Sequence, residues 1–231
     1  MIIKVLDDRG IKYDIKHTKS NKMSISVTKD ALVKIRYHKS INKDRVIEYV
    51  EKHLSWIEQN FLKNYVPPRK YVTGERYLYL GKEYRIRLAL CQKEEVFLDN
   101  GDFVIYTKES SYEHIDKLVK KFIIEQCEIV FSLILDKCFR EMSNYLTKFP
   151  KLEVKGYKRR WGCCYPKEFR VILNMRLIHV PVYLIEYVMY HELCHFVYDN
   201  HQKDFHDLLK KFVPTERKYY KELENYRTNY N

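Results

Sequence analysis

The feature that most constrains the fold of this chain is a pair of histidines inside an apolar stretch. His191 and His195 enclose Glu192 in the segment His191-Glu192-Leu193-Cys194-His195. The residues that flank this segment are mostly apolar: Leu184, Ile185, Val188, Met189, Phe196 and Val197. Burying ionisable side chains in apolar surroundings costs free energy unless they meet a partner. The fold must therefore pack this segment on several sides and still supply its polar groups with a partner.

The spacing of the two histidines predicts a metal site on a helix. Helical residues four apart lie on one face, with Cβ atoms about 6 Å apart, and two imidazoles there can bind one zinc ion at about 2.0–2.1 Å. Glu192 lies about 100° around the helix from His191, so its carboxylate can reach a water on the ion instead of the ion itself. The alternative is a helix whose histidines face solvent and make ordinary hydrogen bonds.

His201 is the candidate third ligand. The helix is expected to begin at Pro181 and to end near Asn200, because asparagine tolerates the left-handed conformation of a C-cap. In a continuous helix His201 would lie about 240° from His195 and would face away from the metal. A turn at residues 199–200 is therefore required to bring His201 back.

Three histidine ligands leave one coordination position open, which is typical of catalytic zinc. Zinc lowers the pKa of bound water toward about 7, and Glu192 would take the proton during attack on a carbonyl and pass it to the leaving amine. The sequence thus predicts a zinc-dependent hydrolase. Four side chains are candidates for stabilising the oxyanion beside the zinc, and the sequence does not choose among them: Arg160, Tyr190, Tyr198 and His206.

The hydrophobic pattern predicts an α+β fold with a β-rich N-terminal region at residues 1–108 and a second region at residues 109–231. Alternating or turn-bounded segments predict strands at residues 2–6, 12–16, 24–28, 32–37, 77–80, 84–88, 96–98 and 103–106. One helix is expected at about residues 40–64, with Ser40 as its cap and Pro67-Pro68 after its end.

Helical patterns dominate the second region. Ser110 and Glu113 resemble a capping box, and a long helix is expected from there to about Leu146. Strands are expected at residues 152–157 and 169–174, with Trp161-Gly162-Cys163-Cys164 in the loop between them. After the histidine helix, two more helices are expected at residues 203–212 and 216–226.

Composition narrows the cellular setting. No apolar run approaches the roughly 18 residues of a membrane span, and no apolar stretch follows the N-terminal charges as in a signal peptide, so we expect a cytoplasmic protein. None of the six cysteines forms a Cys-x-x-Cys pair, and reduced structural thiols are expected. The 43 Lys and Arg against 31 Asp and Glu give a net charge of +12, which makes nucleic acid a candidate partner.

Several further segments match motifs that occur together in one family. They are Trp56-Ile57, Gly74-Glu75 with residues 77–84, Arg160-Trp161-Gly162-Cys163-Cys164, Leu173-Asn174-Met175-Arg176-Leu177, and Asn200-His201 with Phe205. Together with the histidine segment they resemble the YgjP-like metallopeptidases, which are related to SprT-like zincins. The resemblance covers nearly the whole chain. It departs from the family at Cys163, where serine is usual, and at His206, where tryptophan is frequent.

The resemblance implies a zincin-like metallopeptidase fold for the second region, zinc ligands at His191, His195 and His201, Glu192 as catalytic base, and a protein or peptide substrate. It also implies that the strand around Asn174 lies above the cleft, where an extended peptide could add as a further strand. Three residues are candidate substrate contacts, although Trp161 could equally anchor the core or a loop: Arg160, Trp161 and Asn174.

Two other functions compete with a peptidase. Zinc-activated water can attack phosphorus, so a non-peptide substrate such as a nucleotide phosphoanhydride is one alternative, although the chain has no Gly-rich phosphate loop. A DNA-associated protease of the SprT-like type is the other, although the chain lacks an added zinc ribbon or basic extension.

Overall fold

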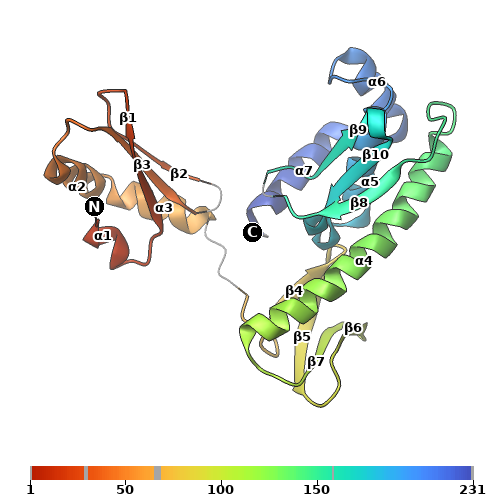
Figure 1. Ribbon diagram of the computed structural model, residues 1–231, viewed down its shortest axis with the longest axis horizontal. Helices are drawn as coiled ribbons and strands as arrows, with labels where there is room; N and C mark the ends of the chain where they lie inside the picture. Colours follow the sequence, from red (N-terminus) through yellow and green to blue (C-terminus); the bar gives the residue numbers. More distant parts are fainter. Residues whose placement is uncertain (1, 29–30, 65–68, 158, 230–231) are drawn as a thin grey trace. The chain divides into compact units, whose positions relative to one another are not determined.

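The computed structural model describes residues 2–28, 31–64, 69–157 and 159–229. It has the predicted α+β class, and the described strands form three mixed sheets (Figure 1). The chain divides into two compact units, residues 1–68 with 227–231 and residues 69–226. None of the described helices combines the length and apolarity that a membrane span requires.

The first unit is a three-stranded sheet with helices. Its elements are α1 (Lys4–Asp7), β1 (Tyr13–Thr18), β2 (Ser24–Val27), β3 (Val33–His38), α2 (Lys43–Lys52) and α3 (Leu54–Asn64). β3 is the central strand, parallel to β1 and antiparallel to β2. Val33, Ile35 and Tyr37 alternate along β3 and are buried, as the period of a strand requires.

Three predictions for this unit were wrong. Residues 2–6 were expected to form a strand, but Ile3 and Leu6 are both buried, at helical spacing, and belong to the turn of α1. The single helix at residues 40–64 is two helices, because the His53 ring binds the Tyr49 carbonyl at 2.7 Å and its backbone N–H bonds Val50 instead. The N-cap of α2 is Asn42, not Ser40. The two prolines expected after the end of the predicted helix, at residues 67–68, lie outside the described residues.

The second unit begins with a four-stranded sheet that packs on a long helix. In spatial order the strands are β4 (Arg76–Tyr79), β5 (Lys82–Leu90), β7 (Asp102–Thr107) and β6 (Glu95–Asp99), and the helix is α4 (Tyr112–Glu141). Tyr77 stacks on Phe103 at 4.0 Å between ring centroids, and both share one core with Ile115 and Val119 of α4. The boundary expected after residue 108 therefore falls inside this unit.

α4 differs from its prediction at both ends. Its N-cap is Ser111, whose hydroxyl donates to the Glu109 carboxylate instead of capping the helix, so the expected box of Ser110 and Glu113 does not form. The helix ends at Glu141 instead of Leu146, and residues up to 146 continue as a hydrogen-bonded turn.

The third sheet consists of β8 (Lys151–Lys155), β10 (Arg170–Asn174) and β9 (Gly162–Tyr165), in that order. β10 is parallel to β8 and antiparallel to β9, with Cys163 opposite Ile172. The segment expected to be a loop at residues 161–164 is therefore a strand from Gly162 onward. Because β10 is paired on both sides, a peptide cannot add to it as a further strand, contrary to the expectation for the strand around Asn174. The edge strands of this sheet are β8 and β9.

The helix with the histidine pair, α5 (Val182–Cys194), lies against this sheet, α4 and α6 (Lys203–Phe212). It is followed by α6 and α7 (Glu216–Asn229), which match the expected helices in place. α5 ends at Cys194, not near Asn200, because the N–H groups of His195, Phe196 and Val197 bond the carbonyls three residues before them. This tightening of the last turn begins the chain reversal earlier than the sequence indicated.

Candidate metal centre

Three histidines from two neighbouring segments converge at the end of α5. His191 lies in the last turn of α5, His195 is its C-cap, and His201 precedes α6. One ring nitrogen from each imidazole lies within 4.8 Å of those from the other two. Nε2 of His191 is 3.0 Å from Nε2 of His201. Two nitrogens on one tetrahedral zinc ion are about 3.3 Å apart. The triad is therefore close enough together to bind a single ion.

The surroundings keep the imidazoles in the form that binds metal. Nδ1 of His195 lies 3.1 Å from the Tyr198 carbonyl oxygen, and donation by this nitrogen leaves Nε2 unprotonated. Burial lowers the pKa of His191 to about 3, and burial also lowers the pKa of His195. The ring of Phe205, fully buried, lies 5.0, 4.7 and 4.8 Å from the three imidazole centroids and forms an apolar floor beneath them.

The turn that delivers His201 uses the residues predicted for it, although the helix has already ended. The chain bends at residues 199–200, and Oδ1 of Asn200 accepts a hydrogen bond from the backbone N–H of Gln202 at 3.1 Å. This side-chain turn leads directly into α6, whose N-cap is Gln202. His201 is thus held between the end of one helix and the start of the next.

Glu192 lies beside the triad in a narrow pocket. The pocket has a volume of about 380 Å³, and its walls are His191, His195, His201, Glu192, Asp199, Gly162, Cys163, Cys164 and Pro166. The Glu192 side chain is buried, at 6% exposure. Burial raises its pKa to about 8, and the positive charge of Arg160 partly opposes this rise.

Gly162 lies at the site but was not among the site residues predicted from the sequence. A Cβ atom at this position would lie 2.7 Å from Oε1 and 2.9 Å from Cγ of Glu192. The backbone of β9 can therefore approach the carboxylate only because residue 162 is glycine. A glycine inside a strand often marks such a close approach, and this signal was hidden by the expectation of a loop.

The three predicted substrate contacts lie away from the walls of this pocket. Asn174 is buried, and its Nδ2 donates to the carbonyls of Tyr157 and Arg160 at 2.8 and 2.7 Å, so it holds the loop before β9. The exposed guanidinium of Arg160 lies 5.3 Å from the centroid of the Tyr157 ring. Trp161 packs against the core, and its buried Nε1 has no partner among the described residues.

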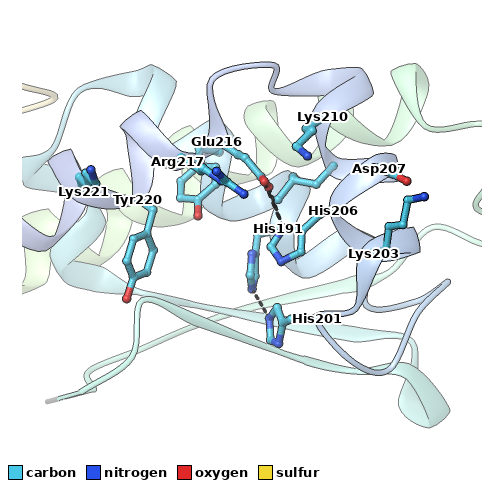
Figure 2. Close-up of a pocket in the computed structure, with 12 residues that line it drawn as sticks. His191, His201, Lys203, His206, Asp207, Lys210, Glu216, Arg217, Tyr220 and Lys221 are labelled. Atoms are coloured by element: carbon cyan, nitrogen blue, oxygen red, sulfur yellow. Dashed lines mark hydrogen bonds and ion pairs between the residues drawn. The ribbon is translucent and has the colours of Figure 1, made fainter.

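A second pocket, of about 790 Å³, lies on the side of the triad that faces α6 and α7 (Figure 2). It shares His191 and His201 with the first pocket and includes His206, one of the four oxyanion candidates. Nδ1 of His206 lies 3.1 Å from both carboxylate oxygens of Glu216, which is buried. Another candidate, Tyr190, is directed elsewhere, because its buried hydroxyl donates to Glu141.

A family model described as a YgjP-like metallopeptidase domain matches residues 21–226. No curated protein matches the chain. The matched region contains the triad, Glu192, Gly162 and both pockets.

Proposed function

This chain belongs to the YgjP-like metallopeptidase family, and from that premise we propose that it is a zinc-dependent peptidase with Glu192 as general base. The observation that carries the proposal is the convergence of three imidazoles within 4.8 Å beside a buried carboxylate. Family membership implies a hydrolase with a metal cofactor. The identity of the metal and the role of Glu192 are the steps that we add.

The donor set fits zinc. Three neutral imidazole nitrogens form a typical zinc ligand set and leave a fourth position open, and His191, His195 and His201 would hold the ion. When bound, zinc supplies a Lewis acid and lowers the pKa of a coordinated water toward about 7.

The protein's own groups would orient the substrate and move the proton. Glu192 would accept a proton at one carboxylate oxygen during attack on the peptide carbonyl and donate it to the leaving amine. Gly162 lets β9 lie against that carboxylate. β9 is an edge strand whose residues 162–164 line the pocket, so an extended peptide could pair with its free backbone groups.

Hydrolysis of a phosphoanhydride is a second candidate, because one observation favours it. Four cationic side chains line the larger pocket beside the triad: Lys203, Lys210, Arg217 and Lys221. Such a pocket would attract a polyphosphate. Association with DNA and a cytoplasmic location stay predictions from the net charge of +12 and from the N-terminal sequence.

The two candidates separate in one assay. Protein loaded with one Zn²⁺ per chain is incubated with a denatured protein and, separately, with nucleoside triphosphates. We expect peptide products, their loss on chelation, and their return when Zn²⁺ is added back. Cleavage of triphosphates alone, or peptide cleavage that persists in the metal-free protein, would overturn the proposed function. DNA binding titrated against salt tests the nucleic-acid prediction, which requires a steep decline in affinity.

A further inference from the structure

The larger pocket extends the site beyond the reacting groups. Two of the triad histidines form part of its wall, and the remainder comes from α6, α7 and Tyr187 of α5. Its volume of about 790 Å³ is in the range of pockets that bind small molecules or several side chains. A substrate placed at the triad would therefore extend into this pocket on one side.

The charges in this pocket are unbalanced. Its wall carries four cations and two carboxylates, Asp207 and Glu216. Nδ1 of His206 lies 3.1 Å from both oxygens of the buried Glu216, and four cations against two carboxylates leave a formal surplus of two positive charges. Within the described part of the chain, none of the four cations forms an ion pair. The pocket therefore has a surplus of positive charge next to the triad.

Among these four cations, Arg217 alone carries a guanidinium. In Figure 2, the side chains of Arg217 and Tyr220 extend from α7 in the part of the pocket that contains His191. The side chain of Lys203 points away from the imidazoles. A guanidinium is planar and pairs with a carboxylate through two parallel hydrogen bonds. The ammonium of Lys210, at the same end of the pocket as Glu216 in this view, adds to the positive potential.

We propose that this pocket is a subsite that binds an acidic residue of the peptide substrate, with Arg217 as its principal anchor. The inference rests on the proposed peptidase function and adds its substrate class. A carboxylate fits the surplus charge, whereas a basic residue would be repelled and an apolar residue would gain nothing from the cations. The pocket thus selects the substrate, while the groups around Glu192 act on the bond.

The test uses zinc-loaded protein and a series of quenched fluorescent peptides that differ at one position. Glu, Gln or Lys is placed in turn at each position on either side of the cleaved bond. At the position that enters the pocket, we expect Glu to give a kcat/KM about tenfold above that of Gln, the size of one charged hydrogen bond, and Lys to give the lowest value. Arg217→Gln should bring the Glu-to-Gln ratio close to one, and Arg217→Lys should retain part of it.

A matched control removes the same charge elsewhere. Lys121 is exposed on α4 and lines neither pocket of the triad, so Lys121→Gln should keep both the ratio and the rate. A readout without catalysis is the affinity of Glu and Gln peptides for zinc-loaded Glu192→Gln protein, measured by calorimetry at two salt concentrations. We expect the Glu peptide to bind more tightly and to lose that advantage at high salt.

Every other outcome overturns either the acidic subsite or the proposed function. If peptides are cleaved at equal rates whatever the charge, or if Arg217→Gln leaves the ratio unchanged, the acidic subsite is wrong and the peptidase stands. A preference for phosphoserine without one for Glu would also overturn the carboxylate assignment. If no peptide of either charge is cleaved by the zinc-loaded protein, the proposed function fails before the subsite does.

Discussion

The two pockets that flank the histidine triad share His191 and His201 but differ in almost every other respect. On the β9 side the pocket is small, Glu192 is buried, and the backbone at Gly162 lies so close that no side chain fits there. On the α6–α7 side the pocket is about twice as large and is lined by exposed charges. Under the proposed function, groups on the first side would control the rate of bond cleavage, whereas groups on the second would control which substrate is cleaved.

The largest expected effect comes from removing the carboxyl group of Glu192 on the β9 side. Glu192→Gln keeps the shape of the side chain but cannot accept a proton, so we expect kcat to fall by about 10³-fold, within the usual range for loss of a general base. Zinc content should stay at one ion per chain. The measurement is single-turnover cleavage of the preferred peptide by the zinc-loaded protein.

The control for this change lies on the same helix. Glu186 of α5 pairs with Lys137 of α4 at 2.7 Å and lines neither pocket. Glu186→Gln should therefore alter the rate by less than about twofold, since exposed ion pairs contribute little. Equal losses in both variants would show that the effect of Glu192→Gln is not specific to the β9 side.

The next effect concerns the residues that the two pockets share. His201→Gln removes one imidazole of the triad, and we expect zinc affinity to fall by more than about 100-fold, because loss of even an outer partner of a ligand costs 10- to 100-fold. His206→Gln, in the same pocket wall but outside the triad, should change zinc affinity far less. Competition with a fluorescent chelator measures both. Similar losses would mean that the triad is not the metal site.

The third effect tests the close approach of β9. In Gly162→Ala the new Cβ would meet the Glu192 side chain at under 3.0 Å, so the carboxylate must move. We expect kcat to fall by about 10²-fold with zinc affinity retained, as displacements of about 1 Å near reacting groups have such costs. The control is Gly156→Ala, whose Cβ would meet only Sδ of Met175 at 3.6 Å. If Gly162→Ala is as active as Gly156→Ala, the closeness of β9 has no role in the reaction.

The sequence could predict those parts of the site that depend on local spacing. His191, Glu192 and His195 are neighbours on one helix, and the turn before α6 brings His201 to them, so the structure brings the expected triad together. The end of α5 was placed too late, since the tightened turn after Cys194 has no sequence signal comparable to a C-cap glycine.

Features that depend on long-range pairing were not predictable in the same way. The strand that begins at Gly162 is short, and it exists because it pairs with β10 across a chain reversal. The cations of the larger pocket are scattered along residues 203–221 and come together only when α6 and α7 fold beside the triad. A helix break set by the His53 ring was likewise invisible in the hydrophobic period of α2 and α3.

The smallest expected effect is a loss of folding stability at acid pH. It sets the range of pH over which the two pockets can be compared. An acid arm of the peptide assay is interpretable only where the protein stays folded. His179, which lines neither pocket of the triad, is buried with Nδ1 2.7 Å from the Leu78 carbonyl oxygen. Burial lowers the pKa of His179 to about 4, whereas the unfolded chain takes up the proton near pH 6.5.

The unfolded state therefore binds more protons between pH 6.5 and 4, so stability falls as the pH is lowered through this range. For this group alone we expect the free energy of unfolding to be about 2 kcal/mol lower at pH 5 than at pH 7. His179→Gln lacks this component, so its stability deficit relative to the unaltered protein should shrink by that amount over the same interval. Urea denaturation of both proteins in chelator at pH 7, 6 and 5 gives the comparison. Parallel pH profiles would show that His179 does not limit acid stability.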